Sequence, residues 1–151
     1  MPTGIDISPV AAEEFERLLP LIAAYQRFYE VEQIDEERNR AFFRRFLAPS
    51  GDGMLIAARE GERIVGYACL YWHFSSTLAT ETVLMNDLFV DEGVRGGGVG
   101  RALIEASAAV ARERGSPHLE WATEPDNHTA QRLYNSTGAE RTEWVEYELG
   151  L

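Results

Sequence analysis

Residues 86–100 of this chain read Asn86-Asp87-Leu88-Phe89-Val90-Asp91-Glu92-Gly93-Val94-Arg95-Gly96-Gly97-Gly98-Val99-Gly100. The residues from Thr82 to Val90 predict a strand that leads into this stretch. A helix is predicted from Gly98 to Arg114, because apolar residues recur at helical spacing and Gly115 stands where a C-terminal cap belongs. The stretch is therefore a strand-to-helix junction, and four of its last five residues are glycine.

The glycine-rich junction predicts an anion site. Glycine lets backbone N–H groups approach a ligand closely, and the following helix adds unsatisfied N–H groups at the positive end of its dipole. Arg95 and Arg101 flank the junction and offer guanidinium groups to phosphate oxygens. No Lys-Ser or Lys-Thr pair follows Gly100, and position 101 lacks the glycine that a dinucleotide fingerprint starting at Gly96 requires. The alternative is a turn whose glycines only allow a tight passage from strand to helix.

The rest of the chain alternates between predicted strands and helices. Further strands are expected over residues 5–8, 54–59, 63–74, 118–123 and 141–149, and further helices over residues 11–29, 35–47 and 127–137. Pro20 is expected to kink or divide the first helix. The residues 60–62 contain a glycine and predict a hairpin, so part of the sheet should be antiparallel. These elements predict an α/β fold with helices on both faces of the sheet, in one domain over residues 1–151.

Composition narrows the classes of function. With 151 residues, 45% of them hydrophobic, the chain can form a sizeable core, and no apolar run has the roughly 20 residues that cross a bilayer. The N-terminus lacks the layout of a signal peptide, and the lone Cys69 excludes a disulfide within the chain, so a cytoplasmic protein without membrane partners is expected. The net charge of −11 disfavours nucleic acid and favours a cationic partner. One Cys and three scattered His show no metal-ligand spacing.

Two segments resemble the GNAT superfamily of N-acetyltransferases. Arg95 to Gly100 matches the family signature R/Q-x-x-G-x-G/A, and Asn127 to Ala139 is similar to the segment N-x-x-A-x-x-L-Y-x-x-x-G. The resemblance covers about residues 57–149 and is closest to the diamine/polyamine acetyltransferases and the small histone/polyamine acetyltransferases. It implies a mixed, largely antiparallel central sheet of six to seven strands with helices on both faces. The chain departs from the diamine enzymes at Asn86, where they typically carry Glu, and Asn cannot accept a proton.

The resemblance implies acetyl-CoA as cofactor and transfer of its acetyl group to a primary amine by direct attack in a ternary complex. The positions that it assigns to the cofactor are Leu88, Phe89, Val90, Arg95, Gly96, Gly97, Gly98, Val99, Gly100, Arg101, Asn127, Ala130 and Tyr134. Tyr134 matches the tyrosine usually assigned as general acid to the CoA sulfur. Its alternative role is packing on the sheet.

Asp87 is the best candidate for the general base, and a carboxylate that only binds backbone is its alternative. His73 is the alternative general base and a candidate residue of the acceptor site, although a histidine in an aromatic run is more often packed. In the family, the junction of the first two helices forms one wall of the acceptor site. Here that junction carries Glu30 and Glu32 among five acidic residues in eight, which attract a cationic amine or form a solvated loop.

The expected acceptor is a polyamine or diamine, with protein lysine or another small-molecule amine as alternatives. Two other classes remain: a non-catalytic acyl-CoA-binding module, and an interaction protein that uses the alternating strand over residues 141–149 as a dimer edge. The last role is compatible with catalysis, and a homodimer is expected.

Overall fold

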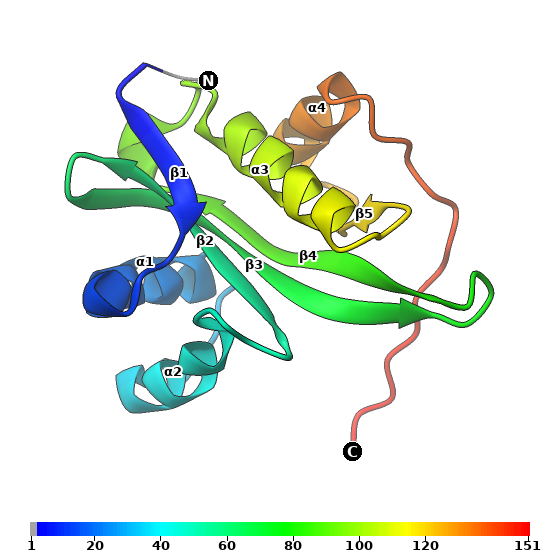
Figure 1. Cartoon of the computed structure of the whole chain (residues 1–151), viewed down its shortest axis with the longest axis horizontal. Coiled ribbons are helices and arrows are strands. Elements are labelled where there is room, and N and C mark those ends of the chain that lie inside the picture. Colours follow the sequence, from blue (N-terminus) through cyan, green and yellow to red (C-terminus); the bar gives the residue numbers. More distant parts are fainter. Residues whose placement is uncertain (1–2) are drawn as a thin grey trace.

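The computed structural model describes residues 3–151, and Met1 and Pro2 lie outside the described residues. Its sheet has the order β1-β2-β3-β4-β5 (Figure 1). The first four strands are antiparallel neighbours, and β5 runs parallel to β4. The strands are β1 (Ile5–Pro9), β2 (Gly53–Glu60), β3 (Arg63–Ser75), β4 (Thr80–Val90) and β5 (Leu119–Glu120). The mixed, largely antiparallel sheet is confirmed.

The expectation of six to seven strands is wrong, because residues 3–151 form five. The segment predicted as a strand over 118–123 keeps only Leu119 and Glu120, since the chain then departs from β4. The predicted strand over 141–149 has no regular secondary structure. Its alternating sequence is typical of a strand, but a strand also needs a neighbour for its backbone groups, and no neighbour pairs with it within residues 3–151.

Four helices accompany the sheet in the described residues. They are α1 (Phe15–Phe28), α2 (Glu36–Phe43), α3 (Val99–Glu113) and α4 (His128–Ser136). Asp35 caps α2 by accepting a hydrogen bond from the Arg38 N–H group at 2.9 Å. Pro20 lies inside α1 without dividing it. The carbonyl that loses its partner there belongs to Glu16, which is exposed, so water can hydrogen-bond to it.

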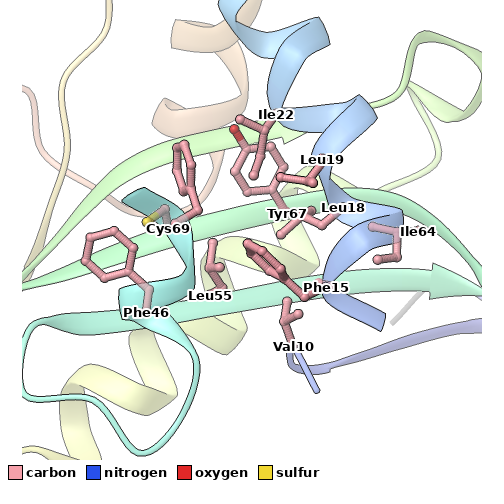
Figure 2. Packing of buried hydrophobic residues seen from close by; sticks show 12 residues of the cluster. Val10, Phe15, Leu18, Leu19, Ile22, Phe46, Leu55, Ile64, Tyr67 and Cys69 are labelled. Atoms are coloured by element: carbon pink, nitrogen blue, oxygen red, sulfur yellow. The ribbon is translucent and has the colours of Figure 1, made fainter. Parts of the chain in front are cut away.

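The helices cover both faces of the sheet, as expected, with α1 and α2 on one face and α3 and α4 on the other (Figure 1). Each face has its own apolar cluster. Under α1, Phe15, Leu18 and Ile22 pack with side chains of β2 and β3, as Figure 2 shows. Under α3, Val99 and Leu103 pack with the opposite side of the same strands. No helix within residues 3–151 combines the length and apolar character needed to cross a membrane.

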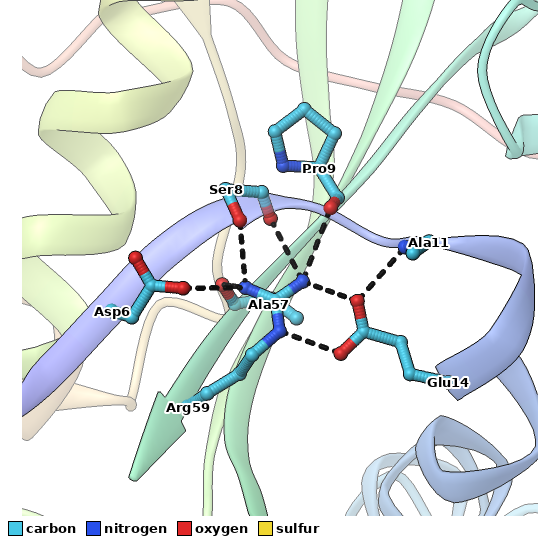
Figure 3. Close-up of polar contacts among 7 residues, drawn as sticks. All are labelled: Asp6, Ser8, Pro9, Ala11, Glu14, Ala57 and Arg59. Atoms are coloured by element: carbon cyan, nitrogen blue, oxygen red, sulfur yellow. Dashed lines mark hydrogen bonds and ion pairs between the residues drawn. The ribbon is translucent and has the colours of Figure 1, made fainter. Parts of the chain in front are cut away.

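A buried arginine ties the N-terminal segment to the sheet. Arg59 on β2 donates from Nε and Nη2 to the two carboxylate oxygens of Glu14, each at 2.6 Å (Figure 3). The same guanidinium donates to Ser8 Oγ at 2.9 Å and to the Pro9 carbonyl at 3.1 Å. The hydrogen bond from Arg59 lowers the pKa of Glu14. This cluster joins β1, β2 and the 3₁₀ turn before α1.

Candidate active site

A β-bulge in β4 places a carboxylate inside the molecule. Cys69 on β3 faces Asp87, whereas Leu70 faces Met85, so Asn86 is the extra residue. The Asn86 side chain lies at the surface, and that of Asp87 is only 4% exposed. Asp87 lies opposite Cys69, which belongs to the apolar cluster on the α1 side of the sheet. The bulge therefore supplies a buried acid where the plain strand pattern predicts a core side chain.

The Asp87 carboxylate lies among hydroxyl-bearing side chains. Burial raises the pKa of Asp87 to about 6, although Asn86 Nδ2 donates to Oδ1 at 2.8 Å and acts in the opposite direction. Burial also raises the pKa values of Tyr25, Tyr67 and Tyr71, and the nearby charge of Asp87 raises each of them further. An acid with a pKa near 6 is ionised at neutral pH and can accept a proton.

The sequence did not single out Tyr67. Its ring lies on β3 beneath α1, beside Ile22 (Figure 2), and it is fully buried. Its hydroxyl has no hydrogen-bond partner within residues 3–151. A buried hydroxyl without a partner is costly and points to a water or ligand in the working protein. The available signal was its spacing of two residues from Cys69, which places both side chains on the face that carries Asp87.

The glycine-rich junction presents unpaired backbone donors. Gly96 and Gly98 both have a φ of 86°, in the left-handed region, and α3 begins at Val99. No acceptor within residues 3–151 pairs with the N–H groups of residues 96–101. Gly100 lets α3 approach α4, because a Cβ there would lie 3.1 Å from a methyl group of Leu133. The junction therefore has the donor set that an anion needs at a helix N-terminus.

The two flanking arginines are partly engaged by the protein itself. Arg95 donates from Nε to the Val90 carbonyl at 3.0 Å and lies over the ring of Phe89, 5.3 Å from its centre. Arg101 donates to the Ser136 carbonyl at 3.0 Å, which links α3 to the end of α4. Both guanidinium groups thus brace the junction, and the backbone N–H groups are its free donors.

The strands separate next to the bulge. β5 pairs with β4 only at Val83–Leu119 and Leu84–Glu120, and the chain then runs to α4. Leu88 and Val90 pack on the side of α3 and α4, and Phe89 packs on the side of α1. The residues 88–90 thus connect the buried Asp87 with the junction.

Tyr134 reaches this region from α4. Asn127 Oδ1 accepts a hydrogen bond from the Ala130 N–H group at 3.1 Å, so these two residues form the cap that starts the helix. The Tyr134 ring meets Trp121 edge to face, with centroids 5.4 Å apart. Burial is the main cause that raises the pKa of Tyr134, and the proximity of Tyr29 raises it further. Tyr134 thus lies close to the C-terminal end of α1, near Tyr29, the residue that follows the helix.

The three proposed acceptor residues do not meet at one point. His73 is half exposed and pairs with Glu120, with 3.3 Å between Nδ1 and Oε1. It lies four residues along β3 from Cys69, the partner of Asp87, which corresponds to about 13 Å along a strand. Glu30 and Glu32 follow α1 and are exposed, and Glu30 has a φ of 57°. They lie close to Tyr29 in the chain, at the end of α1, whereas His73 lies far along β3.

A hollow lies beside the junction. It measures about 600 Å³ and contains Arg17 and Arg27 from α1, Arg63 from β3, and Arg95. The spacing of Arg17, Leu21, Ala24 and Arg27 along one helix stripe was the sequence signal for it. Among the described residues, no group of three His, Cys, Asp or Glu side chains is suited to hold a metal ion.

Known proteins are similar to this chain in sequence and fold. The model of the acetyltransferase (GNAT) family matches residues 18–139. A D-amino-acid N-acetyltransferase of Saccharomyces cerevisiae is 40% identical over 108 residues, which are 70% of this chain and 66% of that protein. The thialysine N-epsilon-acetyltransferase of Bos taurus is 30% identical over 133 residues, 82% of this chain and 75% of the relative.

Solved structures are similar to this chain as well. The crystal structure of a probable acetyltransferase superposes with a TM-score of 0.85 at 28% identity, covering 97% of each chain. The family match spans the bulged strand, the glycine-rich junction and α4. This chain belongs to the acetyltransferase (GNAT) family and is an N-acetyltransferase.

Proposed function

We propose that the protein transfers an acetyl group from acetyl-CoA to a small cationic amine, a diamine or polyamine, by direct attack in a ternary complex. The observation that supports this most is that a buried carboxylate and a set of unpaired backbone N–H groups occur on one strand and on the junction that follows it. The buried Asp87 lies on β4, and the unpaired N–H groups of residues 96–101 follow the end of that strand. A proton acceptor and an anion site are what amine acetylation needs.

The cofactor fits the junction by its chemistry. The N–H groups of residues 96–101, at the positive end of α3, suit a pyrophosphate. Backbone groups of Leu88 to Val90 are proposed to hold the pantetheine arm, since β5 leaves β4 before these residues. Asn127 and Ala130 position α4 alongside. Bound acetyl-CoA supplies the thioester carbonyl that the amine attacks.

The chain's own residues handle the protons. An ammonium group must lose a proton before its nitrogen can attack, and Asp87 is proposed to accept it, directly or through a water. The unpaired Tyr67 hydroxyl is suited to hold such a water. Tyr134 is proposed to donate a proton to the departing thiolate, because a phenol with a raised pKa keeps its proton at neutral pH.

The acceptor is proposed from the charges around the site. Asp87 is buried and negative, Glu30 and Glu32 stand at the end of α1, and the whole chain carries a charge of −11. The tyrosine rings at the end of α1 add faces that attract cations. An amino-acid amine is the second candidate, because two relatives are named for acetylation of D-amino acids and thialysine.

Thiol release from acetyl-CoA tests the proposal. We expect diamines and polyamines to give the highest kcat/KM in a panel that also contains lysine, D-amino acids and a basic peptide. A preference for amino acids would replace the acceptor and leave acetyl transfer standing. Stabilisation by CoA in a thermal shift, without thiol release from any amine, would reduce the protein to an acyl-CoA-binding module.

The proposal includes a homodimer. Apolar side chains near the C-terminus are exposed in the single chain, and burial of such side chains drives association.

A further inference from the structure

The hollow beside the glycine-rich junction gathers positive charge in a chain that is acidic as a whole. It measures about 600 Å³ and is lined by four arginines, Arg17 and Arg27 on α1, Arg63 on β3, and Arg95 before the junction. We call it the arginine hollow. The whole chain has 14 basic residues against 25 acidic ones, so most of its surface repels anions. Four guanidinium groups around one hollow therefore indicate a local site for an anion.

Two of the four arginines already have partners in the protein. Arg63 donates to the Asp91 carboxylate, and Arg95 Nη1 lies 3.6 Å from Glu92 Oε1. Both acidic residues line the arginine hollow as well. The side chains of the two arginines on α1 are exposed, and no hydrogen bond or ion pair among residues 3–151 involves them. The arginine hollow therefore keeps two positive charges that the protein itself does not neutralise.

The two unpaired arginines border the arginine hollow at separate points of α1. Arg17 and Arg27 are ten residues apart, which corresponds to about 15 Å along an α-helix. Between them on α1, Leu21 lines the hollow with an apolar side chain. Ile64 from β3 and Phe89 from β4 line it as well. The arginine hollow thus has an apolar middle between two cationic ends.

We propose that the arginine hollow binds a small dicarboxylate with an apolar chain between its two carboxylates. Each carboxylate pairs with one of the unpaired guanidinium groups, whose planar fork suits two parallel hydrogen bonds to a carboxylate. The two charges of such a ligand match the two unneutralised charges of the hollow, whereas two phosphate monoesters would bring roughly three to four. The volume lies in the range of sites for small organic molecules, about 300 to 1,000 Å³. This site does not depend on acetyl transfer.

The arginine hollow lies apart from the path proposed for the cofactor. β3 and β5 are neighbours of β4 on its two opposite sides (Figure 1). The hollow takes Arg63 and Ile64 from β3, whereas the pantetheine arm is proposed to lie where β5 leaves β4. Residues 96–101, all within the described part of the chain, are not among those that line the hollow. A dicarboxylate and the cofactor can therefore be bound at the same time.

Isothermal titration calorimetry on the full chain, saturated with CoA, tests the site. The probes are suberate, a straight-chain dicarboxylate, its short analogue succinate, and octanoate, which has the chain length of suberate and a single carboxylate. We expect suberate to bind about ten-fold or more tightly than either, because octanoate lacks one charge-assisted contact and succinate is too short to make both. Equal affinities for suberate and octanoate, or no binding of suberate, would overturn the proposal.

Substitution of the unpaired arginines tests which groups hold the two carboxylates. Arg17→Gln and Arg27→Gln should each weaken suberate binding by about ten-fold, to the level of octanoate in the wild type. Arg112→Gln removes the same charge from an exposed arginine of α3, on the other face of the sheet, and should leave the affinity unchanged. Circular dichroism checks that all three variants are folded. Suberate binding that survives both α1 substitutions, or falls as much in Arg112→Gln, would contradict the site.

A comparison of the free protein with the CoA-saturated protein separates the arginine hollow from the cofactor site. Suberate should bind both forms with similar affinity, and neither α1 variant should change kcat for thiol release in its absence. Loss of suberate binding on saturation with CoA, or a lower kcat in both α1 variants, would assign the hollow to the active site and end the proposal. A protein that binds suberate but releases no thiol would remove the proposed activity and leave the dicarboxylate site intact.

Discussion

Asp87 combines a cost to the fold with a role in the proposed reaction. The bulge at Asn86 directs this carboxylate among tyrosines, and burial raises its pKa to about 6. We expect Asp87→Asn to lower kcat by about 100-fold or more, the usual contribution of a general base. The wild-type kcat/KM should rise with pH through about 6 as Asp87 ionises, and the variant should lose this rise. A pH–rate profile of the variant that keeps the same limb would assign the base to another group.

The substitution Asp87→Asn is expected to lower activity but to raise the stability of the folded protein. The pKa of Asp87 lies above its ordinary value of 3.8, so the folded state holds the proton more tightly than the unfolded state does. Wild-type stability is therefore lost as the pH rises from about 4 through about 6, by an amount on the order of 3 kcal/mol. Asp87→Asn avoids the buried charge. Denaturant unfolding should show the variant more stable than the wild type at pH 8, with the gap closing at pH 4.

The proposed donation of a proton from Tyr134 to the departing thiolate can be tested by substitution. Tyr134→Phe keeps the edge-to-face contact with Trp121 and removes only the hydroxyl. We expect a normally folded protein whose kcat falls by roughly ten-fold or more. Circular dichroism and steady-state thiol release measure the two effects. An unchanged kcat with a good amine would leave Tyr134 a packing residue.

Glu30 and Glu32 test how the acceptor is recognised. Both are exposed beyond the end of α1, so their effect on a cation is a surface effect that salt weakens. Glu30→Gln/Glu32→Gln should raise KM for a polyamine several-fold and leave KM for acetyl-CoA unchanged. His73→Gln serves as a control, because His73 lies about 13 Å along its strand from the partner of Asp87. Equal changes in both KM values would remove the two glutamates from acceptor binding.

At the scale of elements, the junction between β4 and α3 depends on its backbone shape. Gly96 and Gly93 both have free space where the Cβ of an alanine would lie, but only Gly96 has a positive φ, 86°. Gly96→Ala should therefore cost about 1 to 2 kcal/mol of stability through strain alone. It should also raise KM for acetyl-CoA, because a backbone that relaxes from the positive φ turns its N–H groups away from the bound anion. Gly93→Ala should change neither quantity much. Denaturant unfolding and steady-state kinetics compare the two, and equal effects would contradict an anion site built on this geometry.

At the C-terminus, a local sequence pattern that is typical of a strand does not lead to a paired strand. The alternation over 141–149 is typical of a strand, and the structure leaves these residues extended but unpaired. The short β5 has the same cause, because the chain leaves β4 after Glu120. Periodicity reports which face a strand would bury. It does not report whether a neighbouring strand is within reach in the same chain.

For the whole molecule, the Arg59–Glu14 pair fixes how the N-terminal segment joins the sheet. Glu14→Gln leaves a buried guanidinium without its counter-charge and should cost about 3 kcal/mol or more near neutral pH. The pKa of Glu14 is lowered, so the stabilisation is present above its ordinary carboxyl pKa and is lost as the pH falls through the lowered value. The gap between wild type and variant in denaturant unfolding should close in acid.

Asp6→Asn is the control for this prediction. Asp6 lies 3.6 Å from the same guanidinium, but its side chain is largely exposed, and such pairs contribute little. The pair lies far from the residues proposed for catalysis along the chain, so kcat should stay unchanged in both variants wherever they are folded. A loss of stability as large in Asp6→Asn as in Glu14→Gln would contradict the buried pair as the main contact.

Local signals of the chain were sufficient to predict most elements and the glycine-rich turn before α3. The hairpin at Gly61, the cap at Asp35 and the turn at Gly96 to Gly100 depend on residues that are neighbours in sequence, so their chemistry can be read directly from the letters. The burial of Asp87, the unpaired Tyr67 hydroxyl and the separation of His73 from both depend on contacts between strands and helices far apart in the chain. A one-residue bulge shifts which side chains face inward, and no local pattern records it. Only the folded sheet decides that register, because the free energy that selects it comes from burial and pairing across the whole molecule.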